Sequence, residues 1–275
     1  MRILLFAIFL MFCSVSGADA QDYKWKSVDM DASRTGCTAV SGTDVEGALG
    51  TFRGDVYVSP NGREFSPSSS TAAVARAVIN AQPGLTGVKA VVAHSSVEMP
   101  NAKSENMLSR WFVELVMNKV SATAGRKVDI GICNFGGLRL GMPKGEVIKD
   151  DIISMFPFKN YLVYLELTGG QLRKIFEDMA VGRFQAVGGV KIVVEDKKLI
   201  SVMVGGEPLE DDKVYSIATI SFLLNGGDGL SLAQGAQNMM ITDVLIVDAV
   251  LEHLAGLEAE GKSITGTEEQ CVIIK

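Results

Sequence analysis

The sequence predicts a domain of the mixed α/β class, of the α+β kind, in which helices and strands follow one another in irregular order. Apolar stretches of strand length recur from about residue 85 to the end of the chain. Segments with helical spacing of apolar residues lie among them. Strands follow helices in some places and other strands elsewhere, which argues against a strictly alternating parallel sheet. The chain after residue 20 is long enough for one large domain or two small ones.

The first 20 residues have the composition of a cleavable secretory leader. Arg2 supplies the positive start, "ILLFAIFLMF" is the apolar segment, and "ADA" at 18–20 is a small-residue cleavage site. The apolar segment is too short to cross a bilayer as a helix, and no later stretch is long enough. We therefore predict cleavage after Ala20, a secreted or periplasmic location, and no membrane span.

The helices are predicted from apolar spacing and from their first residues. Met107, Trp111 and Leu115 recur at helical spacing. Thr168 and Gln171 have the spacing of a capping box, in which each residue satisfies the backbone of the other. Helices are predicted over 71–81, 106–120, 149–156, 168–180 and 243–261.

The strands are predicted from short apolar runs that lie between polar turns. Cys133 ends one such run, "VDIGIC", and is predicted to be a buried strand thiol. With Cys37 and Cys271 it makes an odd number of cysteines after the leader, so at least one thiol stays free. Strands are predicted over 88–93, 128–133, 161–167, 189–195, 199–205, 214–220 and 270–275.

The composition argues against several functions. The net charge of −6 and the pI of about 5.1, without a basic stripe, argue against a nucleic-acid partner. The two histidines, His94 and His253, are too few for a phosphatase site with two metals, which normally combines several histidines and aspartates. A serine nucleophile of the G-x-S-x-G type is absent from the sequence.

Three loops place polar or aromatic residues beside glycine or proline at strand ends, where binding groups concentrate. In "CNFGGLR" (133–139), Arg139 fits a phosphate with its planar fork of donors, or it is a surface residue paired with an acid. In "FPFKN" (156–160), Phe158 either contacts a ligand or packs in the core. These two loops alone leave both alternatives open.

The third loop, "SFLLNGGDG" (221–229), follows a predicted strand. Its Asn-Gly pair is typical of a two-residue hairpin turn. Glycine also allows backbone to approach a ligand closely. In that case Phe158 and Phe222 would clamp a flat base by stacking. Asp228 would accept hydrogen bonds from ribose hydroxyls, as acidic residues do in dinucleotide sites.

These loops and their surroundings resemble the C-terminal, substrate-binding domain of the 5′-nucleotidase family, over roughly residues 85–275. The resemblance implies a layered α/β/β/α sandwich. It also implies that Phe158 and Phe222 hold the base, that Asp228 binds the ribose and that Arg139 faces the phosphate. Asn134 and Asn160 match two further binding asparagines of the family. The motifs are "NFGGLR", "MPKGEVIKDDIISMFPFKNYLVYLELTGGQLRKIFE", "QAVGGVKIVV" and "GEPLEDDKVYSIATISFLLNGGDG".

The chain departs from the usual two-domain organisation of that family. The family's N-terminal metallophosphoesterase domain holds two metals, and residues 21–84, predicted as an extension with a linker helix, are too short for it. Lys103, in "NAKSENMLSR", matches a family arginine only loosely. We therefore predict no cofactor and no catalytic residue in this chain. Hydrolysis would need a separate metallophosphoesterase chain with two divalent metals. The alternatives are a nucleoside-scavenging protein without a catalytic role and a structural relic whose pocket residues only pack.

Overall fold

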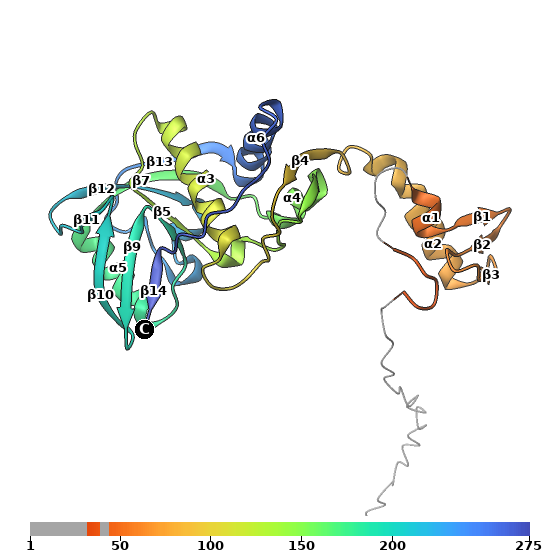
Figure 1. Ribbon diagram of the computed structural model, residues 1–275, viewed down its shortest axis with the longest axis horizontal. Helices are drawn as coiled ribbons and strands as arrows, with labels where there is room; N and C mark the ends of the chain where they lie inside the picture. The colour runs from red at the N-terminus through yellow and green to blue at the C-terminus, as the bar shows by residue number, and fades with distance from the viewer. Residues whose placement is uncertain (1–31, 39–43) are drawn as a thin grey trace, which may run out of the picture.

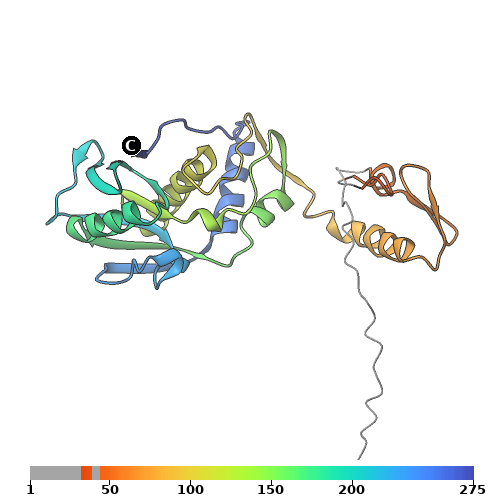
Figure 2. The same cartoon turned by 90° about the horizontal axis from the view of Figure 1, so that it is seen from below.

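The computed structural model describes residues 32–38 and 44–275, so the predicted leader at 1–20 lies outside the described residues. Figures 1 and 2 show a small N-terminal unit beside a larger body. The short helix η1 (Gln82–Leu85) and the residues after it join the two.

The small unit contains regular structure that the sequence analysis did not predict. Three short strands pair in antiparallel order, and the predicted helix packs against the middle strand. Tyr57 is 1% exposed at the centre of this unit. Residues 21–84 were predicted only as an extension with a linker helix, and the strands there were not predicted, because strands of two or three residues are too short to show an apolar period. The elements are α1 (Val45–Leu49), β1 (Thr51–Arg53), β2 (Val56–Val58), β3 (Glu64–Phe65) and α2 (Ser70–Ala81).

A five-stranded mixed sheet is the centre of the larger body. Its β5 and β12 are parallel, and all its other neighbours are antiparallel. The strands, in order across the sheet, are β13 (Gln237–Leu245), β7 (Tyr161–Thr168), β12 (Val214–Ile220), β5 (Ile130–Cys133) and β8 (Ala186–Gly188).

A second sheet has four strands, and a third has two. In the four-stranded sheet, β14 runs parallel to β9 and the other pairs are antiparallel. Its order is β11 (Glu207–Pro208), β10 (Lys198–Val204), β9 (Val190–Glu195) and β14 (Val272–Ile274). The two-stranded sheet consists of β4 (Val91–Ser95) and β6 (Gly145–Ile148).

The helices cover the sheets and confirm the mixed α/β class. The helix α3 packs on the five-stranded sheet, and α5 contacts both β7 of that sheet and β10 of the four-stranded sheet. A Cβ atom added at Gly131 or Gly188 would lie 2.4 or 2.7 Å from Cγ1 of Val113, so glycine lets α3 approach β5 and β8. The helices are α3 (Met107–Ala124), α4 (Lys149–Met155), α5 (Gly169–Val181) and α6 (Ile246–Ala259).

The predicted elements are confirmed with shifted ends, with one exception. The predicted helix over 243–261 was wrong at its start, since residues 243–245 end the strand β13 and α6 begins at Ile246. The sequence analysis missed β13 because this edge strand is exposed over most of its length and therefore shows no alternation. The capping box of Thr168 and Gln171 is present, and Cys133 is fully buried. Among the described helices, none combines the length and hydropathy needed to cross a bilayer.

Candidate functional site

The three loops singled out in the sequence lie at the same end of the five-stranded sheet. The strands β5 and β12 are parallel, so the loops that follow them emerge together. The strand β7 is antiparallel to β12, with Leu162 opposite Ile220, so the loop before β7 lies at the same end of the sheet. The N–H of Tyr161 donates to Oγ of Ser221 at 3.1 Å, which ties the loops of Phe158 and Phe222 together at their bases.

The loop of Phe222 is a compact turn of two short 3-10 helices, η3 (Ser221–Leu223) and η4 (Gly227–Gly229). It is not the two-residue hairpin that Asn-Gly pairs typically form. Backbone hydrogen bonds from Leu232 to Leu223 and from Gly226 to Leu230 close it. A Cβ atom at Gly227 would lie 2.1 Å from the carbonyl oxygen of Phe222, so only glycine fits there.

Asp228 is exposed at the tip of this loop with a left-handed backbone, at φ 47° and ψ 31°. Aspartate is one of the few residues other than glycine that adopts this conformation readily. Asn134 lies behind it and donates from Nδ2 to its carboxylate at 2.7 Å. The side chain of Asn134 is thus engaged with Asp228 and is only 4% exposed as a residue. This arrangement fixes one carboxylate oxygen of Asp228.

The other amide atom of Asn134 has no partner. Its Oδ1 is buried and accepts no hydrogen bond from any residue that the structure describes. A Cβ atom at Gly137 would lie 2.8 Å from this oxygen. An unpaired buried acceptor costs free energy. Asn134 therefore contributes to the position of Asp228 more than to the stability of the fold.

The loop before β7 separates its two phenylalanines. Phe156 is buried and packs on Phe112 with the ring centroids 5.0 Å apart. Phe158 is 48% exposed, and Phe222 is 44% exposed. The alternative that Phe158 packs in the core was therefore wrong. The guanidinium carbon of Arg139 lies 5.9 Å from the centroid of the Phe158 ring, so this arginine and this ring lie together.

Asn160 anchors the same loop through its backbone. Its N–H donates to the carbonyl of Phe158 at 2.9 Å, and its own carbonyl accepts from the N–H of Ile246 at 3.0 Å. The loop is thereby attached to the first residue of α6. The side chain of Asn160 makes no hydrogen bond with the described residues, so its predicted contact with a base stays a prediction.

A polar pocket of about 380 Å³ lies beside Asp228 and Arg139. Lys103 and Arg183 also line it, so its lining contains three cations and one carboxylate. None of these three cations takes part in an ion pair within the described part of the chain. The remaining lining residues are Asn101, Phe135, Gly136, Leu138 and Gln185. The pocket therefore suits an anionic ligand.

Sequence reasoning did not find Arg183 and gave Lys103 no firm role. Arg183 lies in "VGRFQ" directly after α5, and an isolated arginine after a helix carries no motif. Its Nη2 donates to the carbonyl of Lys103 at 2.6 Å, which brings together two residues 80 positions apart. Only the folded chain places them beside Arg139.

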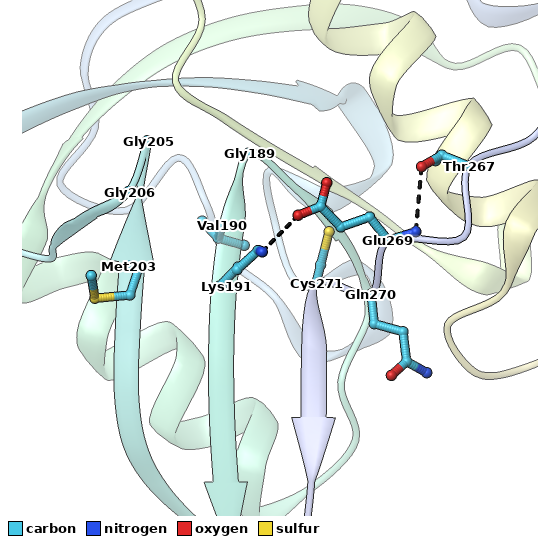
Figure 3. Close-up of a pocket in the computed structure, with 10 residues that line it drawn as sticks. All are labelled: Gly189, Val190, Lys191, Met203, Gly205, Gly206, Thr267, Glu269, Gln270 and Cys271. Atoms are coloured by element: carbon cyan, nitrogen blue, oxygen red, sulfur yellow. Dashed lines mark hydrogen bonds and ion pairs between the residues drawn. The ribbon is translucent and has the colours of Figure 1, made fainter.

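A larger cavity of about 430 Å³ lies elsewhere, on the four-stranded sheet (Figure 3). Lys191 points toward Glu269, and the two pair at 2.6 Å. Burial raises the pKa of the Cys271 thiol to about 11, so this thiol stays protonated and a poor nucleophile near neutral pH. In this cavity Lys191 and Glu269 neutralise each other, so the polar pocket beside Asp228 is the better candidate site.

The described residues contain no group of three or more His, Cys, Asp or Glu side chains placed to hold a metal ion. The three loops 133–139, 156–160 and 221–229 together form the loop cluster. The chemistry available there is stacking, acceptance of hydrogen bonds by a carboxylate, and donation by cations.

Comparisons with known proteins match one part of the chain. A family model described as "5'-nucleotidase, C-terminal domain" matches residues 91–235. The chain is 28% identical over 140 residues to a 5'-nucleotidase of Vibrio vulnificus, which covers 49% of this chain and 25% of that protein. It is 29% identical over 159 residues to the silent protein UshA(0) of Salmonella typhimurium, which covers 54% of this chain and 29% of that one.

The same fold occurs in solved structures. A 5'-nucleotidase precursor from Thermus thermophilus matches with a TM-score of 0.63 and 23% identity, over 76% of this chain and 44% of that chain. The NAD nucleotidase of Haemophilus influenzae matches with a TM-score of 0.58 and 16% identity, over 80% and 47%. In these four comparisons the match spans between a quarter and half of the other protein's length.

Proposed function

This chain belongs to the 5'-nucleotidase C-terminal domain family, and from that premise we propose that it binds a nucleoside or nucleotide at the loop cluster. The base lies between Phe158 and Phe222. Asp228 accepts hydrogen bonds from the ribose hydroxyls, and Arg139 faces the phosphate. Asn160 lies on the side of the base.

One observation carries this proposal: two phenylalanines, each almost half exposed, lie at one end of the sheet beside an exposed carboxylate and a cationic pocket. Exposed aromatic rings next to water lose the burial that would stabilise them in the core. Stacking a base on such a ring is worth about 1–3 kcal/mol. The structural-relic alternative leaves the exposure of both rings without a reason.

The role of Asn134 differs in this proposal from direct binding. Because its amide is buried and donates to Asp228, Asn134 orients the carboxylate toward the ribose. The two glycines that follow Asn134 leave room for this amide, since a side chain at Gly137 would meet its oxygen. Asn134 is thus proposed as a positioning residue.

For hydrolysis we propose a separate metallophosphoesterase chain that supplies two divalent metals and the attacking water. This chain would bind and orient the nucleotide. We propose that it is secreted or periplasmic. Among the described residues there is no cluster of side chains that could hold these two metals. The biological role would be nucleotide catabolism, shared between the two chains.

The test of binding is calorimetric titration of the purified chain with AMP and adenosine. The Phe158→Ala and Phe222→Ala variants should each lose about 1–3 kcal/mol of affinity. Ile241→Ala is the control, because Ile241 is 52% exposed on β13, away from the loops. Wild-type affinity in both phenylalanine variants would show that the rings do not hold the ligand.

The test of the catalytic division is a phosphate-release assay on AMP with Mn²⁺ or Co²⁺. We expect negligible turnover from this chain alone. Turnover that chelation abolishes, and that persists after contaminants are removed, would contradict the proposed division. A chain that binds AMP yet stimulates no metallophosphoesterase would favour the scavenging alternative.

A further inference from the structure

The polar pocket beside Asp228 adjoins a second cavity of about 500 Å³. The two cavities have four lining residues in common: Lys103, Phe135, Arg183 and Gln185. Beyond these four, the second cavity is bounded by the end of α5 and by β9 and β14, which are paired neighbours in the four-stranded sheet (Figure 1). A ligand in the first pocket can therefore extend into the second across this shared boundary.

The boundary has a rigid floor and a cationic rim. Phe135 and Gln185 are 3% and 7% exposed, and the N–H of Phe135 donates to Oε1 of Gln185 at 3.2 Å. Lys103 and Arg183 are exposed above them, linked by the 2.6 Å hydrogen bond from Arg183 to the Lys103 carbonyl. A phosphate at this rim would meet two cations that lack ion-pair partners among the described residues.

The second cavity is mainly apolar beyond this rim. Ile274 of β14 is 70% exposed and lines it, on the same sheet face as its partner Val194, together with Met179 and Phe184. The side chain of Ile273 points to the opposite face of the strand. Four polar residues also line it: Ser104, Glu105, Lys197 and Gln270. The carboxylate of Glu105 accepts from the N–H groups of residues 271 and 272 and pairs with Arg110. That acid is thus occupied in holding β14, and it does not offset the cations at the rim.

We propose that this second cavity is a subsite for an apolar group esterified to the phosphate of the bound nucleotide. The inference rests on the proposed function, because it takes the nucleoside to lie at the loop cluster. The phosphodiester lies between Arg139 and the Lys103–Arg183 rim, which line the same pocket, and its apolar substituent covers the exposed Ile274 of β14. The ligand class is a nucleoside 5′-phosphate that carries an alkyl or aryl ester.

The test compares two ligands of equal charge, the methyl and n-hexyl esters of AMP, by calorimetric titration of the full chain. The hexyl ester should bind about tenfold more tightly, which is the gain that two buried methylene groups supply. The Ile274→Ser variant should reduce this ratio to near one and leave the methyl ester unaffected. Ile200→Ser is the matched control, because Ile200 is 54% exposed on β10 of the same sheet and lines neither cavity.

The Arg183→Gln variant locates the phosphate. It should weaken both esters by the same factor, about threefold, because both carry one phosphodiester charge. Equal affinity of the two esters for the wild type would overturn the inference and leave the proposed function intact. A ratio that survives Ile274→Ser, or an Arg183→Gln variant that binds as the wild type does, would also overturn it. Failure of AMP and of both esters to bind would refute the proposed function itself, and the inference with it.

Discussion

Both ends of the five-stranded sheet carry acidic side chains. The two ends differ in how many hydrogen-bond partners the chain gives these acids. At the end where β5 and β12 begin, the carboxylate of Asp129 accepts from the N–H and the hydroxyl of Ser216, at 3.0 and 2.8 Å. Glu166 at the same end accepts from Tyr164 and Asn238. These acids serve the fold, because their acceptors are occupied by the chain itself.

At the opposite end, polar groups are left available. Asp228 accepts one hydrogen bond, from Asn134, and is otherwise exposed. Arg139 has an aromatic neighbour, Phe158, and no ion pair within the described residues. The comparison teaches that the residue type does not assign a function to an acid in this domain. What decides the function of an acid is the number of hydrogen-bond and ion-pair partners that the folded chain gives it.

The largest expected effect separates the two ends by stability. Asp129→Ala should lower the free energy of unfolding by about 1–3 kcal/mol, because it removes a charged acceptor and leaves the N–H of Ser216 without a partner. Asp228→Asn should change it by less than about 0.5 kcal/mol, since asparagine also adopts the left-handed backbone. Urea unfolding of both variants measures the difference. Equal losses would remove the distinction between the ends.

A smaller effect sharpens the role of Asn134. Asn134→Ala should weaken nucleoside binding by about 1 kcal/mol, because Asp228 loses the donor that orients it. The cost in stability should be small for this buried residue, because the amide oxygen has no partner to lose. Titration with adenosine and a thermal melt of the same sample test both halves. A variant that unfolds easily but binds normally would make Asn134 a purely structural residue.

The smallest effect depends on pH. Hydrogen bonds from Tyr164 and Asn238 hold the pKa of Glu166 below its usual range. A carboxylate with a lowered pKa stabilises the fold above its unfolded pKa, and this contribution is lost as the pH falls through the folded value. Glu166→Gln should therefore be less stable than the wild type at pH 7, by less than about 1 kcal/mol. The difference should shrink from about pH 5 downward. Urea unfolding at pH 7 and pH 4 measures it, and a gap that widens in acid would contradict the assignment.

Much of the fold was predictable because helices and buried strands impose a period on the sequence. The stripe of α3 and the capping box of α5 are local signals. The short strands of the N-terminal unit and the edge strand β13 were not predicted. In both cases too few side chains face a buried surface for a period to form.

The sequence by itself determined the mixed α/β class, the family and the three loops that carry the proposed binding residues, because these depend on patterns of neighbouring residues. Tertiary structure alone decided which side chains stay available at those loops. It buried Phe156 and exposed Phe158, two residues apart in the chain. It also placed Asn134 behind Asp228 and brought Arg183 beside Lys103. These contacts join segments that are 80 or more positions apart. The contact of Asn134 with Asp228 follows from the parallel pairing of β5 and β12, which no local pattern records.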